Sequence, residues 1–324
     1  MSNQTELLKK TGHMSQIAYA RNIIYCDGRA KNLEAVAVKN GDLSFVVAKD
    51  KCMDIIELSY KGRNINFLSK GGLQGLGHYD TNEGEAQRSI MGGLFFTCGL
   101  ENVGPPENGL AMHGRIRSTP AENVSVACRW EDDKYFIRIS AEMRQAMLFG
   151  ENLVLRRTIE TVYGESVIHI HDEITNQGFN TQPLMILYHF NIGYPLLDVS
   201  SSLYVSSKGV TGRDTVADKA LPYWNVISEP VDNKPEEVFY HTLWDKEECF
   251  TRMAGNDVSF RLDFKKTQLP YFTQWKSMAS GDYVMGLEPG NCHVEGMLKE
   301  KEKLTLEYLP SMKSKNIDLK ITLS

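Results

Sequence analysis

Apolar and polar residues alternate with a period of two along most of this chain after about residue 35. Alternating runs at residues 35–38 and 43–47 flank an Asn40-Gly41 pair, which between two such runs is a strong signal for a β-hairpin. Similar short runs, separated by tight turns, continue to the C-terminus. They predict strands at residues 54–60, 65–68, 124–129, 135–143, 153–162, 166–175, 184–191, 258–264, 269–276, 283–287, 304–309 and 317–323. This pattern predicts an all-β fold, with two antiparallel sheets packed face to face as a large sandwich.

A helical segment precedes the period of two, and two long segments interrupt it. Residues 6–20 are amphipathic enough to predict a helix, although Gly12 interrupts it. We therefore expect an N-terminal helical arm over residues 1–30 and a single β-sandwich domain over residues 31–324, because no linker divides the remainder. Residues 71–109 are rich in glycine and residues 208–235 mix charge, Gly and Pro; long loops in a compact β-domain tend to be functional or disordered. Since residues 91–100 are too apolar for disorder, we expect them to line or cover a site.

Composition narrows the classes of partner. The 324 residues carry a net charge of -5 without blocks of one sign, so nothing favours a nucleic acid or an anionic membrane. No stretch is apolar enough to cross a bilayer, and the N-terminus lacks the apolar core of a signal peptide. The six cysteines form no Cys-x-x-Cys pair, which argues against a zinc knuckle or a disulfide framework. Reduced thiols in a cytoplasmic protein are the simplest account.

One predicted strand contains a histidine in an otherwise apolar run. Residues 183–197 read Pro-Leu-Met-Ile-Leu-Tyr-His-Phe-Asn-Ile-Gly-Tyr-Pro-Leu-Leu, with His189 near the middle. Because side chains alternate along a strand, Asn191 returns to the face of His189 while Phe190 points to the other face. Two polar groups on one face would suit a polyhydroxylated ligand such as a sugar. The alternative is a core histidine bonded to a backbone carbonyl, and this strand alone favours that alternative.

Two further segments offer chemistry. Glu288 ends an apolar strand just before a Pro-Gly turn; partial burial would raise its pKa and make it a usable general base near neutral pH. The alternative is an edge-strand glutamate paired with a surface lysine. His113 and Arg115 flank Gly114 and would lie on one side of an extended segment, whereas the alternative is a capped turn with an exposed arginine.

Metal and cofactor signals are weak. His169 and His171 could supply two metal ligands from one strand face, but no third ligand is evident, so we interpret them as a solvated strand face and predict no metal site. No phosphate-binding glycine loop or dinucleotide fingerprint occurs, and no cofactor is predicted. Trp275 could stack on a sugar ring or pack in the core.

Together these pieces resemble the aldose 1-epimerase (galactose mutarotase-like) superfamily, and most nearly its DUF4432 branch. The order and spacing of the matching motifs are the specific part, because each motif is short. They are Gly92-Gly93-Leu94 with Thr97-Cys98-Gly99-Leu100, His113-Gly114-Arg115 with Pro120-Ala121, His189-Phe190-Asn191-Ile192-Gly193-Tyr194-Pro195, and Gly286-Leu287-Glu288-Pro289. The resemblance implies a β-supersandwich with its site on a concave sheet.

The resemblance also implies roles for individual residues. By motif, Glu288 matches the base that takes the proton of the anomeric hydroxyl, and His189 matches the acid that protonates the ring oxygen. His113 matches an upstream histidine that contacts the sugar, and Arg88 loosely matches a substrate-binding arginine. Arg115 and Asn191 would hold further hydroxyls.

One element of the family pattern lacks a clear counterpart. Mutarotases carry a sugar-binding aspartate between the two catalytic residues, in a context that residues 238–245 do not reproduce. His241 or Asp245 could serve in its place.

We therefore predict an isomerase that interconverts the anomers of a sugar by acid–base ring opening. Two alternatives stay open: a protein that binds a sugar or sugar acid without turning it over, and an isomerase of a ketose or a phosphorylated sugar. A small-molecule sugar is the expected partner, and assembly as a homodimer stays open. The sequence does not identify the sugar.

Overall fold

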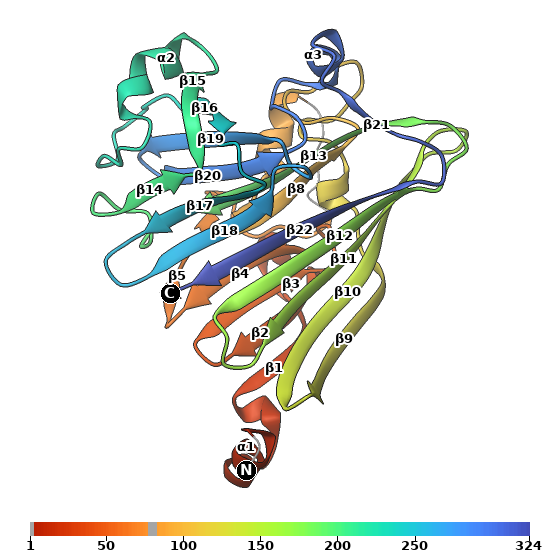
Figure 1. Cartoon of the computed structure of the whole chain (residues 1–324), viewed down its shortest axis with the longest axis vertical. Coiled ribbons are helices and arrows are strands. Elements are labelled where there is room, and N and C mark those ends of the chain that lie inside the picture. The colour runs from red at the N-terminus through yellow and green to blue at the C-terminus, as the bar shows by residue number, and fades with distance from the viewer. Residues whose placement is uncertain (1–2, 77–82) are drawn as a thin grey trace.

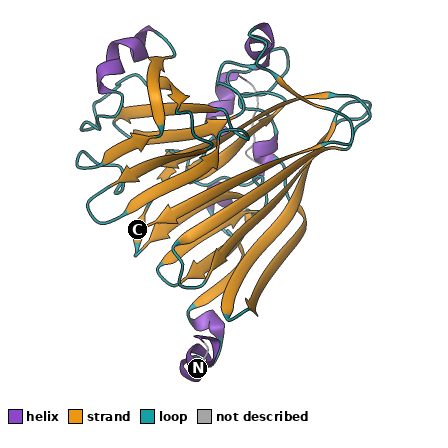
Figure 2. Ribbon diagram, in the orientation of Figure 1, coloured by secondary structure: helices purple, strands orange, loops and turns teal. Residues whose placement is uncertain are grey.

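Three large antiparallel sheets and a two-stranded ribbon dominate the computed structural model, which describes residues 3–76 and 83–324 (Figures 1 and 2). Residues 1–2 of the predicted arm and residues 77–82 of the glycine-rich segment lie outside this description. The all-β prediction is confirmed, and large antiparallel sheets packed as a sandwich are the observed architecture.

The eight-stranded sheet has one buried face and one solvated face. In β12, for example, Ile168 and Ile170 are buried while His169 and His171 between them are exposed, as the period of two predicts. In spatial order the sheet consists of β14 (Ser202–Val205), β17 (Glu248–Ala254), β18 (Ser259–Lys265), β22 (Ser314–Leu323), β12 (Val167–Asn176), β11 (Asn152–Val162), β10 (Lys134–Ala146) and β9 (Glu122–Glu131).

The seven-stranded sheet is covered on both faces along its central strands. Its inner face packs on the eight-stranded sheet, where the rings of Phe190 and Phe260 lie 6.0 Å apart. Its members in order are β15 (Ser207–Gly212), β16 (Glu237–Leu243), β19 (Tyr271–Ala279), β20 (Asp282–Gly290), β13 (Gln182–Ile192) and β21 (Glu307–Leu309), with β8 (Phe95–Leu100) also paired to β13. The prediction of two sheets packed face to face is thus correct for these two.

A third, five-stranded sheet comes from the N-terminal part of the chain. It contains the predicted Asn40-Gly41 hairpin, in which Asn40 pairs with Leu43. Its strands are β1 (Ala18–Ile24), β2 (Glu34–Asn40), β3 (Leu43–Ala48), β4 (Asp54–Tyr60) and β5 (Arg63–Asn64), and the ribbon is β6 (Phe67–Leu68) with β7 (Gly92–Gly93).

The predicted N-terminal helix is shorter than expected. Helix α1 spans Asn3–Lys10, and from Ala18 the chain forms β1, which pairs with β2 along its whole length. The alternation in β1 is weak because only Ala18 in it is buried, so the strand has little period-two signal. The predicted helix to residue 20 is therefore wrong beyond Lys10.

The remaining helices are short. Figure 1 shows α2 and α3 at one end of the molecule, beside the seven-stranded sheet. They are α2 (Thr215–Ala220) and α3 (Met297–Glu302), with 3-10 turns η1 (Met14–Gln16), η2 (Gly28–Ala30), η4 (Glu83–Ser89), η5 (Ile116–Ser118) and η6 (Leu221–Tyr223). The predicted loop at residues 208–235 thus holds β15 and α2. None of the helices in the described residues has the length and apolar character needed to span a bilayer.

One buried arginine joins all three sheets. Arg157 of β11 donates to Asp172 of β12 at 2.6 and 2.8 Å, and to Asp54 of β4 at 2.7 Å. It also donates to the Thr97 hydroxyl of β8 at 2.9 Å. Arg157 and both carboxylates are almost completely buried, so each charge depends on the others for its solvation.

Candidate active site

Cross-strand register places five side chains in a row over the outer face of the seven-stranded sheet. Phe96 of β8 pairs with His189 of β13, Glu288 of β20 pairs with Thr273 of β19, and Thr273 pairs with Tyr240 of β16. Phe190 of β13 pairs with Leu287 of β20, and this register sets His189 beside Glu288. The pairs on β8–β13 and on β20–β19–β16 therefore form one row. Residues directly opposite on neighbouring strands lie about 5 Å apart, so a row of this kind forms a continuous surface.

A second row runs two residues further along the same face. Asn191 pairs with Gly286, Gly286 with Trp275, and Trp275 with Val238. Asn191 is held by hydrogen bonds from its side-chain amide to the carbonyls of Gly93 and His189, at 3.2 and 3.0 Å. The two rows form the floor of a cleft of about 1280 Å³.

The walls of this cleft come from connecting segments that are distant in the sequence. They are residues 67–71, 87–92, 104–105, 112–113, 213–214, 234–236 and 294–299, with Arg29. A volume this large exceeds what one pyranose needs, because ligand pockets for drug-sized molecules are roughly 300–1,000 Å³.

His189 and Glu288 meet on the floor of the cleft. The distance between His189 Nε2 and Glu288 Oε1 is 3.1 Å, and the two side chains are 9% and 2% exposed. The groups are close enough to exchange a proton, but they are not aligned as a hydrogen bond, and Glu288 Oε1 has no hydrogen-bond partner. Each group therefore keeps bonding capacity for a ligand.

Burial shifts the pKa values of this pair in opposite directions. Burial raises the pKa of Glu288 well above its ordinary range, and the nearby Glu236 carboxylate raises it further. Burial lowers the pKa of His189 to about 3, with a further contribution from His113. These directions favour a protonated carboxyl at Glu288 and a neutral imidazole at His189. This is the reverse of the protonation that the resemblance implies, but the pair still holds one proton to give and one site to receive it.

Several buried polar atoms of the residues that line the cleft have no hydrogen-bond partner among the described residues. They are Nδ1 of His113, Nδ1 of His189, Oε1 of Glu288 and Oγ1 of Thr273. Buried polar groups are nearly always satisfied in folded proteins, and each exception calls for an explanation. A ligand rich in hydroxyl groups would satisfy several of these atoms at once.

Aromatic rings flank the histidine. Phe96 stacks on His189 with ring centroids 4.5 Å apart and an angle of 18°, and Trp275 lies edge-on to it at 5.4 Å. The indole nitrogen of Trp275 donates to Glu236 at 2.8 Å, and Glu236 pairs with Arg213 at 3.1 Å. These contacts fix the orientation of the imidazole and of the indole that faces the cleft.

Two glycines allow this geometry. A Cβ on Gly286 would lie 2.5 Å from Oε1 of Glu288 and 2.8 Å from Cβ of Trp275, so the carboxylate occupies the space a side chain would take. A Cβ on Gly114 would lie 1.9 Å from the carbonyl oxygen of Gly99, and Gly114 also has φ +74°. The backbone of Gly114 therefore lies against β8, which brings His113 close to this strand.

The family follows from a comparison of the whole sequence with known families. Residues 30–323 match the model of DUF4432, a domain of unknown function. The chain belongs to the DUF4432 family. None of the curated proteins with which the sequence was compared matches it.

Solved structures share the fold of this DUF4432 protein at low identity. A "putative aldose 1-epimerase" of Klebsiella pneumoniae is 19% identical, with a TM-score of 0.86 over 95% of this chain and 88% of its own. A galactose mutarotase-like protein of Clostridium acetobutylicum is 13% identical, with a TM-score of 0.68 over 95% and 99%. A "putative aldose 1-epimerase" of Escherichia coli K12 is 11% identical, with a TM-score of 0.58 over 89% and 98%. At these identities the likeness establishes the fold.

Six of the nine residues singled out from the sequence of this DUF4432 protein line the cleft. They are Glu288, His189, His113, Asn191, Trp275 and Arg88. They come from separate parts of the chain, and the cross-strand register explains why most of them meet.

The other three residues lie away from the cleft, which corrects their expected role as sugar contacts. Arg115 has a helical backbone conformation before η5, so His113 and Arg115 do not share one side; its side chain pairs with Glu101 at 3.0 Å. His241 faces the core, where its ring nitrogens contact Ser207 and Gln274 at 3.1 and 3.0 Å. Asp245 follows β16 on the surface and pairs with Lys208 at 2.6 Å.

Sequence reasoning missed other residues of the cleft. Thr273 stands two positions before Trp275 on the same strand face, so the period of two could have found it. Phe96 belongs to the apolar run that was expected to line a site, and it does so. Arg29, Arg213 and Glu236 lie in connecting segments, where no periodicity predicts direction.

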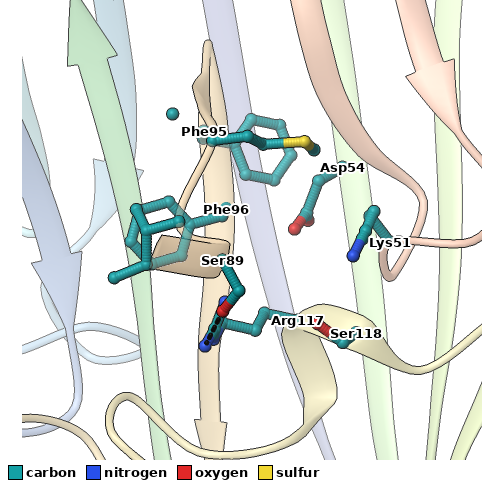
Figure 3. Close-up of a pocket in the computed structure, with 10 residues that line it drawn as sticks. Lys51, Asp54, Ser89, Phe95, Phe96, Arg117 and Ser118 are labelled. Atoms are coloured by element: carbon teal, nitrogen blue, oxygen red, sulfur yellow. Dashed lines mark hydrogen bonds between the residues drawn. The ribbon is translucent and has the colours of Figure 1, made fainter. Parts of the chain in front are cut away.

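A small cavity beside the cleft shares Ile90, Gly92 and Phe96 with it. It has a volume of about 20 Å³ and is lined by Lys51, Asp54 and Arg117 among others. Figure 3 shows Arg117 and Ser89 joined by a hydrogen bond, with Lys51, Asp54 and Phe96 around the same space. The cavity can hold about one water molecule, and its main effect on the site is electrostatic. After burial, Arg117 is the further cause that lowers the pKa of His113, to about 4.

One group of side chains in the described residues has the spacing of metal ligands. The ligand atoms of His293, Glu295 and Glu300 lie within 4.8 Å of one another. Glu295 pairs with Lys303, and Glu300 accepts hydrogen bonds from the His293 backbone and the Thr305 hydroxyl. A metal ion would have to compete with Lys303 for Glu295.

Proposed function

We propose that this protein is an aldose 1-epimerase-like isomerase that interconverts sugar anomers through the open-chain aldehyde. The observation that carries the proposal is the 3.1 Å approach of His189 Nε2 to Glu288 Oε1 on the floor of a large cleft. Unpartnered polar atoms around the pair support a ligand with many hydroxyls.

The reaction needs one proton donor and one proton acceptor. One group removes the proton from O1 while the other protonates the ring oxygen O5, and the C1–O5 bond breaks as the C1 carbonyl forms. The aldehyde rotates about C1–C2, and O5 attacks the opposite face as both protons return. The pair begins and ends with one proton, so no external acid or base is consumed. The pKa directions favour Glu288 as the first donor and His189 as the first acceptor, whereas the resemblance assigns these roles the other way round.

The remaining floor residues would position the sugar. Thr273 and His113 offer unpartnered atoms to hydroxyl groups, and Trp275 offers an aromatic surface beside them. Excluding water from this part of the cleft would strengthen each of these polar contacts.

Anomer exchange in a panel of free aldoses, measured by saturation-transfer NMR, tests the proposal. We expect exchange above the spontaneous rate in the wild type, and a loss of about 10²–10⁴-fold in Glu288→Gln and in His189→Gln. Glu160→Gln, which alters a partly exposed ion pair with Arg138 on the other large sheet, is the control for a carboxyl-to-amide change. Wild-type exchange in a folded Glu288→Gln protein would refute the proposal. Saturable binding of a sugar without exchange would instead support a binding protein.

A further inference from the structure

Arg29 brings to the cleft a positive charge that no carboxylate of the described residues neutralises. Its Nη2 donates to Gln74 Oε1 and to the Arg88 carbonyl oxygen, each at 3.2 Å. Both acceptors are neutral, and no ion pair joins Arg29 to an acidic group in the part of the chain that the structure describes. The guanidinium therefore keeps its full charge at the wall of the cleft.

The position of this guanidinium is set by the surrounding chain. Gln74 is completely buried, and its amide nitrogen donates to the same Arg88 carbonyl at 2.9 Å. The amide of Gly75 donates to the Arg29 carbonyl at 2.8 Å. A Cβ on Gly71 would lie 2.8 Å from Gln74 Nε2 and 3.3 Å from Arg29 Nη1, so the glycine leaves room for both groups. A cation held in this way loses little entropy when it binds a ligand.

Apart from Glu288 on the floor, the acidic groups that line the cleft have cationic partners, in contrast to Arg29. Among the described residues, Arg213 pairs with Asp214 and Glu236, Lys70 with Asp282, and Lys303 with Glu295. Lys299, like Arg29, lines the cleft without a carboxylate partner among these residues. Arg88 also lines the cleft. In a protein of net charge -5, cations concentrated at one cleft favour the approach of anions.

We propose that the substrate is an aldose bearing an anionic group, a carboxylate or a phosphate, and that Arg29 binds this group. The inference rests on the proposed function for its chemistry at C1, but not for the binding of the anion. Arginine presents a planar set of donors that matches both kinds of oxyanion. The volume of the cleft leaves space for such a group beyond the ring.

Matched sugars and one substitution test this inference. Anomer exchange is measured for D-galactose, D-galacturonate and D-galactose 6-phosphate with the wild type and with Arg29→Gln, which removes the charge. Arg21→Gln is the control, because Arg21 likewise has a neutral acceptor, the Ser15 carbonyl, and no acidic partner among the described residues, and it lies outside the cleft. Isothermal titration with the same three sugars measures binding independently of exchange.

We expect the wild type to favour at least one of the two anionic sugars by about tenfold or more in kcat/KM. We expect Arg29→Gln to lose about 10- to 100-fold on that sugar, the effect of a charge-assisted contact, and to change less than about twofold on galactose. The preferred sugar identifies whether the group is a carboxylate or a phosphate, and Arg21→Gln should match the wild type.

The outcomes separate this inference from the proposed function. Equal exchange of neutral and anionic sugars by the wild type, or equal losses on both in Arg29→Gln, would overturn the inference and leave the isomerase intact. If no aldose is exchanged, the isomerase proposal fails and titration decides the anion site. If an anionic sugar binds and Arg29→Gln weakens its binding, the anion site is supported. If the anionic sugars bind no more tightly than galactose, the anion site is overturned.

Discussion

Gly286→Ala should inactivate the protein while leaving its fold in place. The new methyl group would lie 2.5 Å from Glu288 Oε1, 2.8 Å from Trp275 Cβ and 3.3 Å from Trp275 Cε3. Nonbonded contacts of carbon are optimal near roughly 3.5 Å, so the carboxylate must move by about 1 Å. The Trp275 Cβ belongs to the paired strand and cannot move away easily, which directs the strain to the carboxylate.

The size of the effect follows from the pair that this displacement disturbs. A shift of about 1 Å changes the 3.1 Å approach of Glu288 to His189, and misplacement by this amount can cost about 10²-fold in rate. Crowding of a packed site costs typically about 1–3 kcal/mol of stability, so the variant should remain folded. Anomer exchange by NMR and thermal unfolding by circular dichroism measure the two effects separately.

Two controls test whether the loss acts through Glu288. Gly209→Ala adds the same methyl group to β15 of the same sheet, where the nearest atom is 3.7 Å away, and should match the wild type. The double variant of Gly286→Ala with Glu288→Gln should be no slower than Glu288→Gln alone, because both changes disable one group. Wild-type exchange in Gly286→Ala, or additive losses in the double variant, would refute the reasoning.

Three further predictions concern the core and the floor of the cleft. Arg157→Met should lower the free energy of unfolding, measured by urea denaturation, by about 3–5 kcal/mol, because it leaves two buried carboxylates uncompensated. Arg156→Met, on the exposed face of the same strand, should lower it by less than about 1 kcal/mol. Equal losses in the two variants would refute the role of Arg157. Thr273→Val should not lower stability, since the hydroxyl has no protein partner, but should weaken sugar binding about tenfold by titration; a loss of stability would reveal a structural partner. His241 is held neutral by burial, which lowers its pKa to about 4; the stability it supplies is complete above its unfolded pKa of about 6.5 and declines as the pH falls towards 4. Between pH 7 and 5 the free energy of unfolding of the wild type should fall by about 2 kcal/mol more than that of His241→Gln. An identical pH dependence of stability in the two proteins would contradict this prediction.

The alternation of apolar and polar residues was sufficient to predict most strands of the two large sheets. It also placed His189 and Asn191 on one face and Phe190 on the other, which the packing of Phe190 on Phe260 confirms. The third sheet was not predicted as a separate layer, because alternation says which face of a strand is buried but not which sheet the strand joins. The pairing of β1 with β2 depends on contacts that no local pattern encodes.

The errors in the site have equally local causes. Arg115 was expected to share a side with His113, but the chain turns into η5 at that point and sends the arginine towards Glu101. His241 was considered as a replacement for the sugar-binding aspartate, although Val238 on the same strand faces the cleft and the odd spacing of three sends His241 to the core. Only a known register could have distinguished the two faces of this strand.

The proton-transfer pair and the recognition surface are built from different kinds of backbone. His189, Glu288 and Thr273 are fixed by hydrogen-bonded strands, where inserting a single residue would turn the following side chains to the opposite face. Arg29, Arg213 and Lys299 project from turns and short helices, which accept insertions and deletions readily. Remodelling of these connections can therefore change the proposed sugar specificity while the proposed reaction centre is inherited unchanged.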